Sequence, residues 1–281
     1  MAMAERALSL LRADPDLAYR HRARAVLEFL DLRPGERVLE CGCGLGFLLE
    51  LVARAAECDL HGLDVSPGRL RATARVLDRR AALIVADAAW LPYRDGGFDK
   101  VILSEVLEHL LDDSAALREV YRVLRTEGVV AITVPSQHYP LLYDPVNRLL
   151  EGAGLSPIRR GPFSGIWTDH LRLYSREGIV RLVEEAGFQV AEVRATTRFC
   201  IPFSHNLFYG LGPWLLRRLS GPEGARPSQG RGGSSRLLAL AARVASAIDR
   251  LNGDCYHRGP VVNICVKARR PRWHACREAS L

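Results

Sequence analysis

The 281-residue sequence has no uninterrupted apolar segment approaching about 18 residues, so no membrane-spanning helix is expected. The residues from Met1 to Arg6 include no apolar signal core, so no secretory leader is expected either. Seven cysteines are scattered without the spacing of a disulfide framework, and an odd number cannot all pair within one chain. These absences favour a cytoplasmic protein with reduced thiols.

The sequence also has few cysteines at the spacing of metal ligands. Cys41 and Cys43 are separated by one residue, but no second pair lies nearby and a glycine stands between them. A structural zinc site needs four ligands, so this pair does not predict one. We therefore expect no metal.

The charge of the chain is unevenly distributed. The whole chain has 39 Lys and Arg against 32 Asp and Glu, whereas residues 191–281 have 15 against 5, a net charge of +10. Subtraction leaves 24 against 27 in residues 1–190, a net charge of −3. The basic region could meet nucleic acid, anionic lipid or a phosphorylated substrate, but a solvated arginine-rich surface is the interpretation we favour.

The most informative feature is an apolar run that ends in three alternate glycines, Gly42, Gly44 and Gly46. Glycine tolerates positive φ in such a tight turn and lets a ligand approach the main chain. An acidic residue, Glu40, stands near the end of this predicted strand, and Asp64 ends the next one. A carboxylate at the tip of the second strand can accept both hydroxyl groups of a ribose.

This order of an acidic residue, three alternate glycines and a second acidic residue resembles the class I S-adenosylmethionine-dependent methyltransferases. More narrowly, it is similar to their small-molecule branch, which includes the ubiquinone and menaquinone methyltransferases. The NAD-binding pattern needs another glycine at position 47, where this chain has Phe47. The resemblance implies S-adenosylmethionine as the cofactor, with Glu40 toward its cationic methionyl end. The cofactor-binding residues that it implies in this region are Glu40, Gly42, Cys43, Gly44, Gly46, Asp64 and Val65.

Two later segments extend the resemblance. A third apolar run, residues 81–85, is followed by Asp87 and Ala88, which match the family's acidic and small residues beside the adenine. A fourth predicted strand, residues 97–103, leads into Ser104, which we also expect to contact the cofactor. In the family this segment lies along the methionine side and the acceptor site.

The pattern predicts an α/β fold: a doubly wound, mostly parallel seven-stranded sheet with an antiparallel last strand, as in the Rossmann-like methyltransferase fold. Helices are expected over residues 17–30, 117–124 and 176–186, and the last two strands over residues 188–193 and 261–266. The expected divisions are an N-terminal extension (1–16), a cofactor-binding core (17–134), a lid insertion (135–174), a core helix and strand (175–196), a second lid insertion (197–260) with a flexible linker (220–235), a final strand (261–268) and a basic tail (269–281).

Both insertions begin at the carboxyl edge of the sheet, so we expect them to cover the donor site and form an acceptor pocket. They are rich in aromatic residues, which indicates a hydrophobic or lipid-like small-molecule acceptor, although some must form the insertions' own core. The aromatic and histidine residues concerned are Tyr139, Tyr143, Phe163, Trp167, His170, Tyr174, Phe199, Phe203, His205, Phe208, Tyr209 and Trp214. Residues 236–251 predict a basic amphipathic helix, which could lie at the inner membrane surface but more often packs on its own domain.

The predicted reaction is in-line transfer of a methyl group, for which a base near neutrality is useful. We take His109 and His170 as the candidate catalytic residues, ahead of Glu108. A nucleic-acid methyltransferase acting on RNA and a non-catalytic scaffold are the alternatives. Family members that methylate amino groups of nucleic acids carry an Asn/Asp-Pro-Pro-aromatic motif after the fourth strand. This chain has Ser104-Glu105-Val106-Leu107 there, which argues against the nucleic-acid methyltransferase. The intact glycine loop argues against the non-catalytic scaffold.

Overall fold

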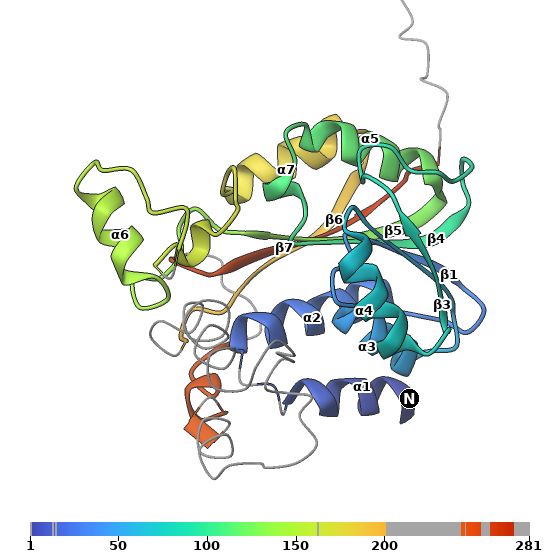
Figure 1. Cartoon of the computed structure of the whole chain (residues 1–281), viewed down its shortest axis with the longest axis horizontal. Coiled ribbons are helices and arrows are strands. Elements are labelled where there is room, and N and C mark those ends of the chain that lie inside the picture. Colours follow the sequence, from blue (N-terminus) through green and yellow to red (C-terminus); the bar gives the residue numbers. More distant parts are fainter. Residues whose placement is uncertain are drawn as a thin grey trace, which may run out of the picture.

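The computed structural model describes residues 2–12, 14, 16–161, 163–200, 243–244, 246–253 and 259–272. Seven strands form one sheet in the order β3-β2-β1-β4-β5-β7-β6 (Figure 1). β7 runs antiparallel to both of its neighbours, while β1 to β5 pair in parallel. The predicted fold is therefore confirmed. The strands are β1 (Arg37–Cys41), β2 (Asp59–Asp64), β3 (Ala81–Val85), β4 (Phe98–Ser104), β5 (Leu124–Pro135), β6 (Gln189–Thr196) and β7 (Asn263–Arg269).

Helices cover both faces of the sheet, as Figure 1 shows. One buried cluster joins the sheet to α5 and α7, and a second joins the opposite face to α2, α3 and α4. α1 packs against α2 and α3, so the segment expected as an N-terminal extension adds a helix to the second face. The helices are α1 (Ala2–Arg12), α2 (Leu17–Leu30), α3 (Phe47–Ala55), α4 (Pro67–Leu77), α5 (Asp113–Val123), α6 (Pro145–Gly152) and α7 (Arg176–Glu185), with short 3₁₀ turns at Leu107–His109 and Gly165–Trp167.

Two predicted helix ends lie one residue too far, at Leu124 and at Ala186, and α5 begins earlier than predicted, at Asp113. The helical spacing of residues 117–124 extends through Leu124, but α5 ends at Val123 and Leu124 begins β5. Leu124 pairs with Phe98 of β4 in a part of the ladder where the register then shifts. Strand pairing thus overrides the helical spacing at this position.

The first insertion packs against other parts of the fold. Tyr139, Tyr143 and Ile166 are buried in a small cluster with Ala18 of α2, Cys200 and Val262, and Trp167 packs against this cluster. This corrects the expectation that these aromatic residues line an acceptor pocket, because their rings hold the insertion against α2 and the segments next to β6 and β7. Phe163 is half exposed, and Tyr174 joins the main core.

Much of the second insertion lies outside the described residues. This applies to Phe203, His205, Phe208, Tyr209 and Trp214, to the linker at 220–235 and to most of the amphipathic segment at 236–251. Residues 243–244 and 246–249 are helical, as predicted for that segment. Among the helices that the structure describes, none has the length and apolar character needed to span a membrane.

Candidate active site

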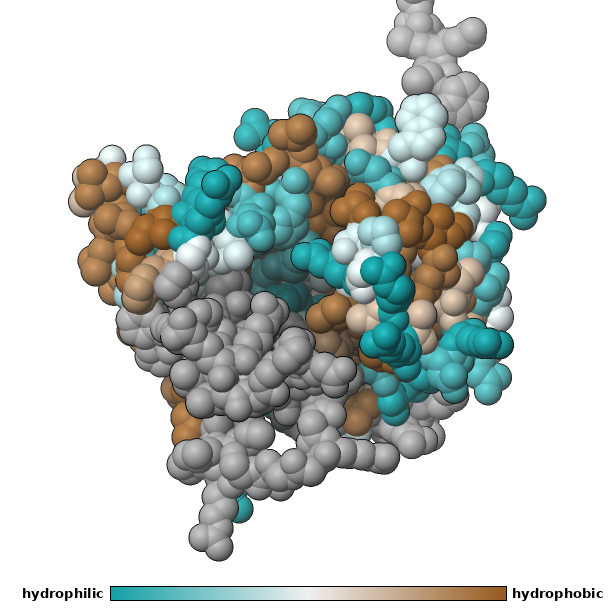
Figure 2. Space-filling view, viewed as in Figure 1, coloured by the Kyte–Doolittle hydropathy of each residue, from teal (hydrophilic) through white to brown (hydrophobic). Residues whose placement is uncertain are grey.

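A cleft of about 610 Å³ opens at the carboxyl edge of the parallel strands. The surface in Figure 2 is hollowed near the centre of the face shown, with hydrophilic residues inside the hollow. Because β1 to β4 run in parallel, the segments that follow them meet at this edge. The residues lining the cleft are Gly42, Leu63, Asp64, Val65, Arg69, Ala86, Asp87, Ala88, Ala89, Glu105, Val106, His109, Leu110, Leu111, Asp112 and Asp169.

The glycine loop joins β1 to α3 with all three glycines at positive φ, 69° at Gly42, 56° at Gly44 and 77° at Gly46. A Cβ at Gly42 would lie 2.6 Å from a methyl carbon of Val106, and one at Gly46 would lie 2.6 Å from a methyl carbon of Thr73. A Cβ at Gly44 would meet nothing nearer than 4.0 Å. Gly42 and Gly46 therefore let the loop pack closely, and of the three glycines Gly42 is the one that lines the cleft.

Asp64 ends β2 and turns its carboxylate toward this loop. Its Oδ2 accepts a hydrogen bond from the Gly44 N–H at 3.0 Å, and its Oδ1 accepts one from the Ser66 N–H at 2.8 Å. The side chain is buried but borders the cleft. Each carboxylate oxygen can accept a further hydrogen bond, so the group suits a pair of adjacent hydroxyls such as those of a ribose.

Glu40 is a buried carboxylate of β1 behind the glycine loop. It accepts a hydrogen bond from the backbone N–H of Leu49 in the first turn of α3, and its Oε2 has no partner among the described residues. Burial, and then the negative charge of Asp64, raise the pKa of Glu40 well above its ordinary value. An incoming cationic group would satisfy the orphaned oxygen, which fits the amino end of S-adenosylmethionine.

The other predicted cofactor residues divide into two groups. Val65, Asp87 and Ala88 line the cleft with Gly42 and Asp64, and Asp87 is fixed by a hydrogen bond from the Ala89 N–H at 2.9 Å. Cys43 is buried against α3, and the Ser104 hydroxyl bonds Thr133 at 2.9 Å, so neither lines the cleft. The assignment of all these residues to the cofactor stays a prediction.

Glu105 lines the cleft where the sequence pattern pointed to Ser104. Its φ of 54° turns the chain just beyond β4. The carboxylate accepts hydrogen bonds from Thr133 at 2.9 Å and from Asn263 at 3.1 and 3.2 Å, and Arg22 lies 3.9 Å away. The apolar pattern of the strand does not predict a left-handed residue at position 105. Because the chain turns there, Glu105 lines the cleft in place of Ser104.

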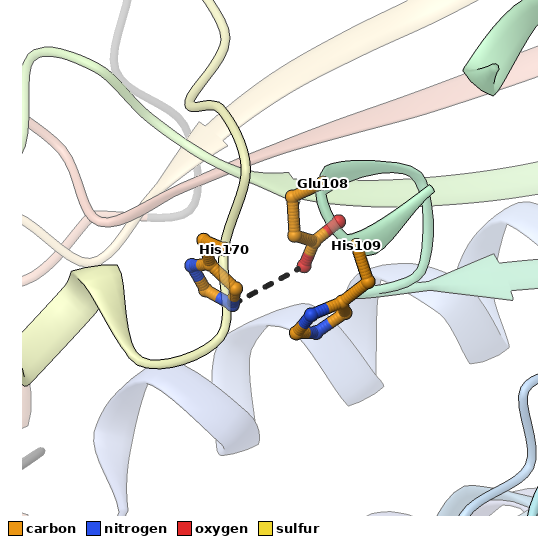
Figure 3. A group of neighbouring side chains, drawn as sticks. All are labelled: Glu108, His109 and His170. Carbon is orange, nitrogen blue, oxygen red and sulfur yellow. Dashed lines mark ion pairs between the residues drawn. The ribbon is translucent and has the colours of Figure 1, made fainter. Parts of the chain in front are cut away.

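Glu108, His109 and His170 lie close together, and His109 is the one of the three that lines the cleft (Figure 3). The rings of the two predicted catalytic histidines are 4.7 Å apart between centroids. His109 is exposed and lines the cleft, and its Nδ1 lies 3.0 Å from the carbonyl oxygen of Asp169. His170 Nε2 lies 3.8 Å from Oε1 of the fully buried Glu108. Burial, and then the charge of Glu105, raise the pKa of Glu108 well above its ordinary value.

Residues 39–132 match the family described as "Methyltransferase domain". Together with the strand order, this match identifies a class I S-adenosylmethionine-dependent methyltransferase domain in the chain. The predicted cofactor of the domain, S-adenosylmethionine, is thereby confirmed. Glu40, the glycine loop and Asp64 form a set of groups that fits it.

Named relatives support the same class, and a solved structure shares the fold. The chain is 36% identical to "Methyltransferase GfsG" of Streptomyces halstedii over 37% of its own length and 40% of that protein. It is 37% identical to "Demethylmenaquinone methyltransferase" of Roseiflexus sp. (strain RS-1), over 38% and 46% respectively. The chain thus spans less than half the length of these two relatives. Haemonchus contortus phosphoethanolamine N-methyltransferase 2 in complex with S-adenosyl-L-methionine shares the fold, with a TM-score of 0.54 and 18% identity over 89% of this chain and 52% of that one.

The raised pKa of Glu40 predicts that cofactor binding releases protons. A cation beside Glu40 favours the carboxylate, so its pKa falls on binding. Affinity should therefore rise with pH above the ordinary glutamate value of 4.5, until the pKa of the free protein is reached. Calorimetry at one pH in two buffers of different ionisation enthalpy counts the protons.

Glu40→Gln should bind S-adenosylmethionine about 10- to 100-fold more weakly, because one charge-assisted hydrogen bond contributes about 1.5–3 kcal/mol. Its affinity should also be independent of pH over the same range. Wild-type binding without proton release would contradict this account of Glu40.

Proposed function

We propose that the protein transfers the methyl group of S-adenosylmethionine to a polar atom of a small, largely hydrophobic acceptor. The observation that carries this proposal is the shared cleft: the Asp64 carboxylate borders it at the donor end, and His109 lines it beside a second histidine. The lining also includes apolar side chains, among them Leu63, Val106 and Leu110. Such walls suit an acceptor with hydrophobic surface.

The relatives support a small-molecule acceptor. Besides the demethylmenaquinone enzyme, the chain is 29% identical to the "27-O-demethylrifamycin SV methyltransferase" of Amycolatopsis mediterranei (strain S699), over 53% of its length and 55% of that protein. Quinone-type compounds are one instance of the acceptor class we propose. Action on RNA has no comparable support from the described part of the cleft, which combines Glu105, Asp112 and Asp169 with one arginine, Arg69.

When bound, S-adenosylmethionine supplies an already activated methyl group. The chain then has to align the acceptor, and good alignment can contribute about 7–11 kcal/mol of barrier reduction. In this proposal His109 takes the proton of the acceptor hydroxyl or amine, and the freed lone pair attacks the methyl carbon. The carbon–sulfur bond breaks as the new bond forms, and S-adenosylhomocysteine leaves.

The proposal is tested by incubating the full chain with methyl-labelled S-adenosylmethionine and three acceptor groups: hydrophobic phenols and quinols, polar metabolites of similar size, and RNA. We expect labelled product with the hydrophobic hydroxyl compounds. Labelling confined to polar metabolites or RNA would refute the acceptor class. Tight binding of S-adenosylmethionine without transfer to any acceptor would favour the scaffold alternative.

His109→Asn should lower methyl transfer by about 10²- to 10⁴-fold, the usual contribution of a positioned base, and leave the Kd for S-adenosylmethionine within about two-fold. His138→Asn is the matched control, since His138 is exposed and is not among the residues lining the cleft. Equal activity of the two variants would remove His109 from the mechanism. Single-turnover rates and calorimetry supply both readouts.

A further inference from the structure

Three side chains with metal-binding atoms come together from two parts of the chain. Glu108 and His109 lie in the 3₁₀ turn after β4, and His170 lies in the first insertion, about sixty residues later (Figure 3). One donor atom from each lies within 4.8 Å of the other two. Two nitrogen atoms and one carboxylate oxygen form a donor set typical of divalent transition metals.

Glu108 gives the strongest reason to expect an ion here. The residue has no exposed surface, and neither oxygen of its carboxylate accepts a hydrogen bond from another described residue. The nearest nitrogen of His170 is 3.8 Å from Oε1, which is longer than a hydrogen bond. A buried carboxylate without hydrogen bonds is costly, and buried charges are usually paired or coordinate metals.

His109 is held in the tautomer that a metal ligand needs. Its Nδ1 lies 3.0 Å from the backbone carbonyl oxygen of Asp169, and a carbonyl can only accept, so Nδ1 carries the proton. In the neutral ring Nε2 therefore keeps its lone pair. Metal-bound histidines commonly donate their other ring N–H to a backbone carbonyl in this way.

The separations suit a shared ion after a small adjustment. Two ligands bound at about 2.1 Å can lie at most about 4.2 Å apart. The 3.8 Å between Glu108 and His170 falls within that limit, while the widest pair in the group, at up to 4.8 Å, must close slightly. His109 is the exposed member, so its ring has room to move.

We propose that Glu108, His109 and His170 bind a divalent cation of the zinc, manganese or cobalt type, and that an acceptor oxygen completes its coordination. This rests on the proposed methyl transfer and names its acceptor class: a hydroxyl compound, best with a second oxygen adjacent. The sequence expectation of no metal considered only Cys41 and Cys43, which are free and buried here. Glu105 borders the same cleft but is already held by Thr133 and Asn263.

Three protein ligands leave coordination positions open for water or substrate. An acceptor hydroxyl bound there becomes more acidic and loses its proton to solvent. The resulting oxygen attacks the methyl carbon, the carbon–sulfur bond breaks, and S-adenosylhomocysteine leaves. In this form of the mechanism His109 acts on the acceptor through the ion instead of taking the proton itself.

The test uses the full chain, freed of metal with a chelator and then titrated with Zn²⁺, Mn²⁺ or Co²⁺ alone. We expect one equivalent to bind, with visible absorption from Co²⁺ in a nitrogen- and oxygen-ligated site. Glu108→Gln and His109→Gln should each weaken binding of the ion by at least 100-fold, and His138→Gln should not change it. His109 is exposed, and we therefore expect the His109→Gln variant to fold. This variant tests the metal site even if Glu108→Gln fails to fold.

Methyl transfer by the chelated protein should fall at least ten-fold and recover on addition of the ion. No binding below millimolar concentration, or binding unchanged in both ligand variants, would overturn the site. Binding with no effect on transfer to any accepted compound would overturn the role in acceptor coordination. Since ion and S-adenosylmethionine binding are both measured without an acceptor, a metal site in a protein that methylates nothing would refute the proposed function alone.

Discussion

Asp64→Ala should bind S-adenosylmethionine at least about 100-fold more weakly than the wild type, the largest loss we expect from one side chain in the cleft. A hydrogen bond to a charged group contributes about 1.5–3 kcal/mol, and two ribose hydroxyls would lose such a bond together. The substitution also releases the N–H groups of Gly44 and Ser66 from the carboxylate. Isothermal calorimetry with the cofactor and with S-adenosylhomocysteine measures the effect.

Asp95→Ala is a suitable control, because its side chain is exposed and pairs with Arg122 away from the cleft lining. Asp64→Asn separates the two roles of the carboxylate, which are binding the ribose and accepting hydrogen bonds from the backbone. It keeps one acceptor oxygen but cannot accept from both backbone N–H groups, so its affinity should lie between those of the Asp64→Ala variant and the wild type. An affinity within three-fold of the wild type for a folded Asp64→Ala protein would rule out the ribose contact.

Gly165→Ala should destabilise the first insertion by about 3 kcal/mol or more, a size typical of severe steric or buried polar disruption. A Cβ there would lie 1.8 Å from Oδ2 of Asp144, and φ is +51°. Asp144 is buried and accepts hydrogen bonds from the Asn147 side chain at 2.7 Å and the Ile166 N–H at 2.9 Å, so it has little room to move. Thermal unfolding should show a Tm lower by about 10 °C, from the usual 2–4 °C per kcal/mol in chains of similar size.

The matched control for Gly165 is Gly154→Ala in the same insertion. Gly154 also has positive φ, +72°, but a Cβ there would meet nothing within 4 Å. Its cost should be about 1–2 kcal/mol, from backbone strain alone. Equal losses of stability in the two variants would show that the contact with Asp144 does not limit this segment.

Gly165→Ala should also separate donor from acceptor binding. The insertion carries His170 next to Glu108 and His109, whereas Asp64 and the glycine loop belong to other elements. We therefore expect weaker methyl transfer with the Kd for S-adenosylmethionine unchanged within about three-fold.

The sheet could be predicted from the sequence because each of its signals is local. The glycine loop, the apolar runs and the helix stop at Gly187 each act within a few residues. The line of carboxylates and glycines at the carboxyl edge then follows from parallel pairing. Ser104 and Glu105 show the limit of this reasoning, because a single left-handed residue decides which of them borders the cleft.

The interior of the first insertion was not predictable in the same way. Its aromatic composition is compatible with a pocket wall or with a buried core, and Tyr139 and Tyr143 are buried in a cluster with residues of α2 and of the segments next to β6 and β7. The approach of His170 to Glu108 depends on the whole path of the intervening chain. No spacing rule connects residues about sixty positions apart, so the two histidines were candidates individually and became a pair only in three dimensions.

β7 enters the sheet between β5 and β6, although it is the last of the described strands along the chain. Until it arrives, β5 has one unpaired edge and β6 has no partner among the described strands. A nascent chain that stops before Asn263 would therefore expose the backbone edges of both strands, which favours aggregation. Pairing of β7 with β5 and β6 is thus the step that joins β6 to the sheet.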